Sequence, residues 1–263
     1  MLLREDGGKM PGGMPKANTF SICAVDPDTG EAGVAVASRC LSVGAHVPYA
    51  EPGVGAVATQ AMINPAYGPA GLALLRKGVV ADEVVRRLTD ADVTITAPDD
   101  PQAEIIRGEG LTDEGADFFR DADGRIVWLT SRMRQLGVVD RGGRAAVHTG
   151  QRTQPWAGAI VGEGFCCQGN LLAGEQVVAA MAEAFVKTRA EGRRLAAPLL
   201  AAIQAGDAAG GDRRGKQAAG ILVVRHGGHW TGSDRWCDVR VDDHAEPVAE
   251  LARILGDRGF LKV

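Results

Sequence analysis

Residues that could hydrolyse an amide bond occur in three separate stretches of this chain. Thr19 opens an alternating segment, Gln60 ends another, and Asn170 follows a Gln-Gly pair. A threonine hydroxyl attacks a carbonyl carbon once a base removes its proton, and neutral amide side chains can donate hydrogen bonds to the oxyanion that forms. The alternative is structural, because threonine is an ordinary strand residue and buried amides often tie loops together.

Two further segments carry groups suited to binding a small charged molecule. Asp212 and Arg213 lie in the glycine-rich segment 210–215, and together they could bind a zwitterionic or acidic substrate. Arg39 could hold a carboxylate through two parallel hydrogen bonds. An ion pair inside the glycine-rich segment would instead only hold the loop. The expected partner is a small-molecule substrate or ligand.

Cysteine offers an alternative nucleophile. The chain has five cysteines among its 263 residues, an odd number in a chain too long to need disulfides, and we expect reduced thiols. Cys23 or the Cys166-Cys167 pair would need a base nearby to act as a catalytic thiolate.

No cofactor and no metal are expected. The sequence has no Gly-Lys-Ser/Thr phosphate loop, no dinucleotide fingerprint after its first strand and no Gly-x-Ser-x-Gly elbow. The remaining candidate zinc ligands match no strong spacing pattern: His226, His229, Cys237 and His244.

The composition excludes several classes of protein. A net charge of −4 argues against a nucleic-acid-binding protein, because a polyanion is bound by an excess of lysine and arginine. No apolar run reaches the roughly 18 to 20 residues that span a bilayer, and the first residues lack the apolar middle of a signal peptide. We therefore expect a cytoplasmic protein with neither a membrane nor a nucleic-acid partner.

The segments that must position Thr19 read as paired strands. Residues 1–18 lack periodicity and are expected to form a flexible tail or propeptide, with residues 19–263 as one domain. Residues 19–24 alternate apolar side chains with small hydroxyl and thiol side chains, which predicts a strand with two different faces. The turn at residues 26–30 predicts a hairpin into a second strand over 33–38.

The same patterns predict the other elements. Strands are expected over 53–60, 125–129, 135–140, 144–149, 156–161, 216–225 and 237–241. Helices are expected over 69–77, 82–88, 175–189, 195–205 and 247–255. Residues 91–131 are rich in Asp, Gly and Pro and are expected to form an insertion or lid, whereas 168–170 and 206–215 are expected to be loops. Hairpin links between strands favour an antiparallel, layered α+β domain over a parallel sheet.

Several of these segments carry motifs that resemble a known family. The motifs are TFSICAVDPDTGEAGVAVASR at 19–39, GVGAVATQ at 53–60, RQLGVVD at 134–140, Gly169-Asn170, GGDRRG at 210–215 and VDDH at 241–244. Their types and order are similar to those of domain-of-unknown-function family 1028, which is grouped with the N-terminal nucleophile (Ntn) hydrolases. The resemblance runs from Thr19 to about Leu255.

The resemblance implies a fold and a chemistry. The fold would be a four-layer αββα sandwich of two antiparallel sheets. Because homo-oligomers are common in the superfamily, the chain is expected to form a homo-oligomer, a dimer or larger. Thr19 would become the first residue of the mature chain and would attack an amide carbonyl, with its own α-amine as the base. An α-amine has a pKa of about 7.7 to 8.0, so much of it is unprotonated near neutral pH. Ser38 and Arg39 would form the polar strand end beside Thr19, and the expected activity is hydrolysis of a small or short-peptide C–N amide bond.

Three departures from the superfamily pattern keep a rival function open. Ala37 stands where proteasome-type members have an acid, Asn18 precedes Thr19, and Gln60 stands at the end of the third strand, near which no lysine occurs. If residues 1–18 are retained, Thr19 has no α-amine to act as a base. The rival is a non-catalytic small-molecule-binding or scaffold protein on the same fold.

Overall fold

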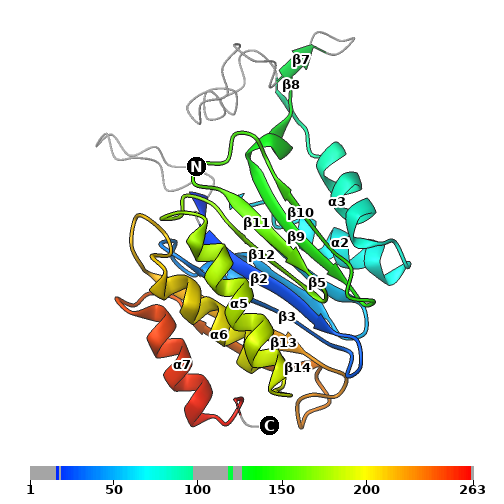
Figure 1. Cartoon of the computed structure of the whole chain (residues 1–263). Helices are drawn as coiled ribbons and strands as arrows, with labels where there is room; N and C mark the ends of the chain where they lie inside the picture. The colour runs from blue at the N-terminus through cyan, green and yellow to red at the C-terminus, as the bar shows by residue number, and fades with distance from the viewer. Residues whose placement is uncertain (1–15, 18, 97–117, 121–125, 262–263) are drawn as a thin grey trace, which may run out of the picture.

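The described residues of the computed structural model are 16–17, 19–96, 118–120 and 126–261 (Figure 1). They form two large antiparallel sheets. The six-stranded sheet runs, from edge to edge, β11 (Gly158–Gly162), β12 (Phe165–Gly169), β2 (Thr19–Asp26), β3 (Glu31–Ser38), β13 (Ala218–Val224) and β14 (Arg235–Val241). The five-stranded sheet consists of β1 (Lys16–Ala17) and β4 (Pro48–Glu51), which both pair with β5 (Gly55–Met62), followed by β9 (Arg134–Asp140) and β10 (Ala145–Thr149).

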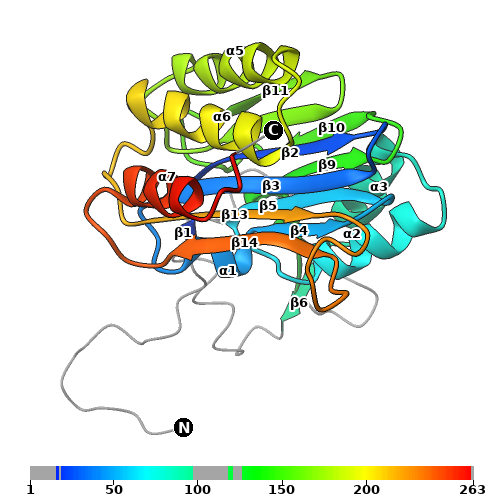
Figure 2. The same cartoon turned by 90° about the horizontal axis from the view of Figure 1, so that it is seen from below.

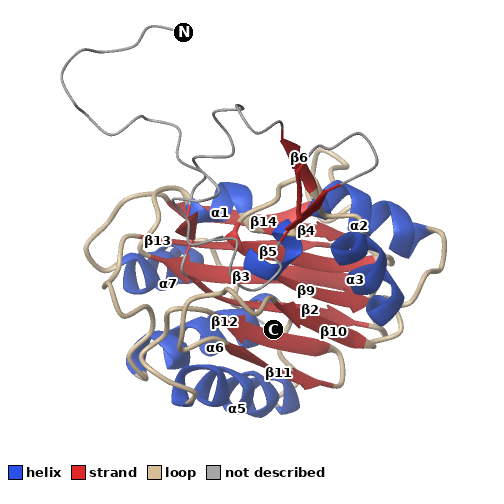
Figure 3. Ribbon diagram, turned by 90° about the horizontal axis from the view of Figure 1, so that it is seen from above, coloured by secondary structure: helices blue, strands red, loops and turns tan. Residues whose placement is uncertain are grey.

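Helices cover the outer faces of both sheets, so the molecule has four layers (Figure 2). The six-stranded sheet is covered by α5 (Gln176–Ala190), α6 (Ala196–Ala208) and α7 (Pro247–Asp257), and the five-stranded sheet by α2 (Tyr67–Arg76) and α3 (Ala81–Asp90). The strand axes of the two sheets are roughly aligned (Figure 3). This arrangement confirms the predicted α+β sandwich.

Three smaller elements complete the described chain. A short helix α1 (Val43–His46) precedes β4, and a 3-10 helix (Thr130–Met133) leads into β9. A separate three-stranded sheet contains β6 (Thr94–Thr96), β8 (Ile126–Trp128) and β7 (Phe118–Arg120). Residues 97–117 and 121–125 of the predicted insertion at 91–131, like most of the predicted tail at 1–18, lie outside the described residues. No helix in the described ranges is long and apolar enough to cross a membrane.

The strand β2 has the two faces that its alternation predicts. Phe20, Ile22 and Ala24 pack in the apolar core beneath α5 and α6. Cys23 lies in the second core, between the sheets, and Ser21 on the same face bonds to β5. Alternate strand residues point to opposite sides of a sheet, so Thr19 also faces the five-stranded sheet.

The structure corrects several predicted boundaries. The predicted loop at 168–170 contains the end of β12, whose side chains are buried on both faces and therefore show no alternation of polarity. The third strand begins at Gly55 and continues to Met62, and α6 runs on to Ala208, inside the predicted loop. Thr19 is not the first strand residue either, because β1 precedes it. The segments that became α1 and β4 carried no prediction.

Candidate functional site

The candidate site lies between the sheets, where β2 begins and β3 ends. Thr19 pairs with Ser38 across these two strands, and both side chains are buried. The Thr19 hydroxyl donates a hydrogen bond to Ser38 Oγ at 3.2 Å. The strand pairing thus brings together two hydroxyl residues that are 19 positions apart in the sequence.

Gln60, from β5, holds the backbone of Thr19. Its Nε2 donates to the Thr19 carbonyl oxygen at 3.2 Å and to Gln135 Oε1 at 2.7 Å, and its Oε1 accepts from Ser21 Oγ at 2.7 Å. Both amide hydrogens of Gln60 are therefore used. This leaves Gln60 as a group that positions Thr19 and removes it as a free donor for an oxyanion.

Asn170, directly after β12, approaches Thr19 from the other side. Its backbone N–H donates to the Thr19 carbonyl oxygen at 3.0 Å, and its Nδ2 donates to Gln135 Oε1 at 3.1 Å. Its Oδ1 is buried and has no hydrogen-bond partner among the described residues, and the same holds for Gln168 Oε1. An unpaired buried acceptor lowers the stability of the fold by about 1–3 kcal/mol, so a ligand that donates a hydrogen bond to these oxygens would be favoured.

Gln135, on β9, is the centre of this cluster and was missed as a site residue by the sequence analysis. Besides accepting from Gln60 and Asn170, its Nε2 donates to Thr149 Oγ1 at 3.0 Å and to the carbonyl oxygens of Gly169 at 2.9 Å and Gly158 at 3.3 Å. The one available signal was its place in the RQLGVVD motif. Its role depends on the pairing of β5 with β9, which sets Gln135 opposite Gln60.

Close approach of the sheets also depends on a glycine. A Cβ at Gly137 of β9 would lie 3.0 Å from Cys166 Sγ and 3.2 Å from Gln168 Nε2. Gln168 itself donates to the Ala58 carbonyl oxygen at 3.2 Å and to Ser21 Oγ at 3.4 Å. The absence of a side chain at Gly137 thus leaves room for the amide of Gln168.

The amide cluster contains no charged group. Its side-chain hydrogen bonds between described residues join Thr19, Ser38, Ser21, Gln60, Gln135, Gln168, Asn170 and Thr149 through neutral groups. Ala37 packs in the core beneath α5 and α6, on the opposite face of β3 from Ser38. A general base for Thr19 must therefore come from a group that this cluster does not contain.

The glycine-rich segment is held by an internal ion pair. Asp212 is buried; its Oδ1 accepts from the backbone N–H of Arg214 at 2.9 Å and its Oδ2 from Arg214 Nη2 at 2.8 Å. Its Oδ2 also accepts from the backbone N–H of Arg39 at 3.0 Å. The partner of Asp212 is thus Arg214, while the Arg213 side chain is exposed.

These residues nevertheless lie close to the amide cluster. The Arg39 guanidinium donates to the Arg214 carbonyl oxygen, which places it at the rim of the site. A cavity of about 60 Å³ is lined by both Ser38 and Asp212. The structure therefore groups Thr19, Ser38, Gln60 and Asn170 in one cluster, with Asp212 and Arg39 beyond Ser38.

The cysteines have the environment of structural thiols. Cys23, Cys166 and Cys167 are buried, and burial raises the pKa of the Cys23 and Cys167 thiols well above the usual value. Cys23 Sγ donates to the Gly137 carbonyl oxygen at 3.7 Å. A protonated thiol is a poor nucleophile, so this environment disfavours cysteine as the catalytic nucleophile. Within the described ranges, no three His, Cys, Asp or Glu side chains gather in a way that could hold a metal ion.

Comparisons with known proteins identify relatives of unknown function. The model of DUF1028, a family of unknown function, matches residues 19–126 and 128–251. A similar solved structure is the crystal structure of protein SPO2555 from Silicibacter pomeroyi, which carries the same family model. It is 27% identical, with a TM-score of 0.67, and the match covers 91% of this chain and 88% of that one. No curated protein of known function matches the chain.

Proposed function

The chain belongs to the DUF1028 family of unknown function, and we propose that it is an Ntn-type hydrolase of small or short-peptide amide bonds, with Thr19 as its nucleophile. In this proposal, cleavage before Thr19 removes residues 1–18 and creates the α-amine that the neutral cluster lacks. The family match begins at residue 19, which supports a functional unit that starts there.

The observation that carries the proposal is the pairing of β1 with β5 beside the site. Lys16 and Ala17 pair with Met62 and Ala61, directly after Gln60 in β5. In the intact chain the Thr19 side chain is completely buried. Loss of residues 1–18 would remove β1 from β5, and we expect this to expose Thr19 at the same step that frees its amine.

The proposed reaction uses the Thr19 hydroxyl together with the α-amine that cleavage creates. The α-amine of Thr19 takes the proton of its hydroxyl, Oγ1 bonds to the substrate's carbonyl carbon, and the proton passes to the nitrogen as the C–N bond breaks. An amine leaves, and water then hydrolyses the ester to release a carboxylic acid and restore Thr19. Asn170 is the better candidate donor to the oxyanion, because only one of its two amide hydrogens has a partner among the described residues.

The test is the mass and N-terminal sequence of the purified protein, expressed once from Met1 and once from Met14. We expect a mature chain that begins at Thr19, cleavage retained in Thr19→Ser and in the turn variant Thr29→Ala, and no cleavage in Thr19→Ala. Release of amine from a panel of small amides and dipeptides should then require Thr19 or serine at this position, and should rise with pH toward about 8 as the α-amine loses its proton.

A ligand-binding protein without catalysis is the second candidate. It is favoured by the complete burial of Thr19 in the intact chain and by the neutral bonds around it. A wild-type chain that keeps Asn18 and releases no amine would support this candidate and exclude the hydrolase. Cleavage that persists in Thr19→Ala would assign the processing to another protease and leave the amide panel to decide.

A further inference from the structure

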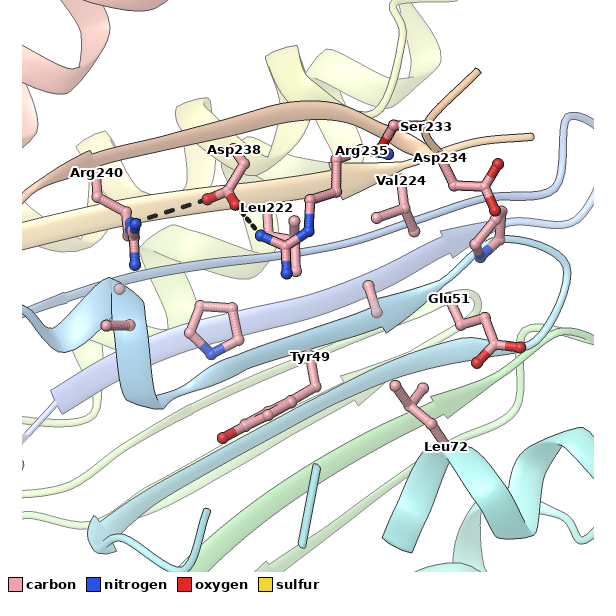
Figure 4. A pocket seen from close by; sticks show the side chains of 15 residues that line it. Tyr49, Glu51, Leu72, Leu222, Val224, Ser233, Asp234, Arg235, Asp238 and Arg240 are labelled. Carbon is pink, nitrogen blue, oxygen red and sulfur yellow. Dashed lines mark hydrogen bonds and ion pairs between the residues drawn. The ribbon is translucent and has the colours of Figure 1, made fainter. Parts of the chain in front are cut away.

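A second pocket lies on the side of the sandwich, beneath the edge strand β14. Among the described strands, β14 pairs with β13 alone, whereas the opposite sheet ends at β4, which lies against β3 and β13. The six-stranded sheet therefore projects beyond the five-stranded one. The space under the projecting strand is a pocket of about 420 Å³, within the size range of small-molecule sites (Figure 4).

A β-bulge directs an additional arginine into this pocket. Val223 pairs with Cys237 but Val224 pairs with Arg235, so Trp236 is an extra residue in β14. Without the bulge, Arg235 would lie on the opposite face from Asp238. With it, Arg235 joins Asp238 and Arg240 on the pocket side (Figure 4). Bulges often re-aim side chains next to functional sites.

The β14 wall of the pocket has an excess of positive charge. Asp238 is shared by two arginines: it pairs with Arg235 and lies 4.0 Å from Arg240 Nε. One carboxylate against two guanidinium groups leaves one positive charge and several N–H groups without partners among the described residues. The two other acids of the lining are Glu51, which is paired with Arg76, and Asp234, which accepts the Gly227 N–H at the loop end.

The lining also includes apolar side chains, which come from β13 beside β14 and from α2 on the other side. Leu72, Leu222 and Val224 provide the apolar part of the lining. The Tyr49 ring packs closely against Gly68, where a Cβ would lie 2.2 Å from the ring. Tyr49 packs, like Leu72, against the core between the five-stranded sheet and α2.

We propose that this pocket binds a small organic carboxylate with an apolar body, held by the guanidinium groups of Arg235 and Arg240. The planar guanidinium matches a carboxylate through parallel hydrogen bonds, and the apolar residues match a hydrocarbon body. Ala218 of β13 pairs with Ser38, and Leu222 lies four residues further along the same strand. Four residues of a strand span roughly 13 Å, so the pocket at Leu222 is about that far from Ser38. The pocket is thus a site separate from Thr19, and the proposal does not depend on amide hydrolysis.

Calorimetric titration tests the proposal with three probes: 4-methylpentanoate, 3-methylbutylamine and inorganic phosphate. We expect saturable binding of the carboxylate and none of the amine. The carboxylate should bind roughly tenfold more weakly to Arg240→Gln and to Arg235→Gln, because each variant loses one guanidinium group. Arg253→Gln is the matched control, because Arg253 is a similarly exposed, ion-paired arginine on α7, and it should bind like the wild type.

Each contrary outcome overturns the proposal. Absence of carboxylate binding up to about 10 mM would mean that the pocket has no useful affinity. Equal binding by Arg240→Gln, with its fold verified by thermal melting, would remove the guanidinium from recognition. Phosphate that binds as tightly as the carboxylate and displaces it would make the pocket a phosphate site, without a role for the apolar wall.

Discussion

Replacement of Gln135 by methionine should test whether the buried amide cluster holds the site together. Methionine keeps much of the length and volume of glutamine but removes all five hydrogen bonds that the Gln135 side chain makes. The amides of Gln60 and Asn170 are completely buried and would each lose a bond.

The expected loss of stability follows from these unpaired groups. A buried polar group without a partner costs about 1–3 kcal/mol, so two such groups give roughly 2–6 kcal/mol. Burial of the more apolar methionine side chain stabilises the fold by about 1 kcal/mol. We therefore expect the free energy of unfolding to fall by about 3 kcal/mol, which lowers the Tm by roughly 6–12 °C in a chain of this length.

The assay is urea unfolding followed by fluorescence, with Gln151→Met as the control, because Gln151 is an exposed turn residue. The control should change the free energy of unfolding by less than about 0.5 kcal/mol. A double-mutant cycle between Gln60→Met and Gln135→Met should give a coupling above about 0.5 kcal/mol. A loss below about 1 kcal/mol in Gln135→Met, or no coupling with Gln60, would refute the reasoning.

Three further predictions concern buried groups. At pH 8 iodoacetamide should label Cys40 alone in the native protein and all five cysteines after denaturation, as measured by intact mass; rapid labelling of any other native cysteine would contradict the burial. Burial raises the pKa of the Cys23, Cys167 and Cys237 thiols, in the last case to about 12. As the pH rises, the unfolded chain therefore loses these protons before the folded chain does. The free energy of unfolding should thus fall as the pH rises above about 9. Arg134→Met should lower the free energy of unfolding by about 3–5 kcal/mol, because it leaves the buried carboxylate of Asp92, which lies 2.7 Å from Arg134 Nε, without its ion-pair partner. A loss under about 1 kcal/mol in urea unfolding would contradict this.

The local pattern of the sequence was sufficient to predict much of the fold. The alternation at residues 19–24 predicted a strand with an apolar face and a hydroxyl and thiol face, and β2 has both. The turn at 26–30 predicted the β2–β3 hairpin, and the periodicity over 175–189 predicted α5. These features depend on neighbouring residues, whose spacing determines which side of a strand or helix they occupy.

The site itself depended on contacts that no local pattern contains. Gln135 meets Gln60 because β5 pairs with β9, and Asp212 pairs with Arg214 because of how the loop folds, although Arg213 is its sequence neighbour. β12 was missed because burial on both faces removes the alternation that marks a strand. The sequence determined by itself which side chains share a face of β2. The register between strands distant in sequence, and the projection of one sheet beyond the other, are set by packing across the whole domain, so only the tertiary structure decided which residues form the amide cluster and the pocket beneath β14.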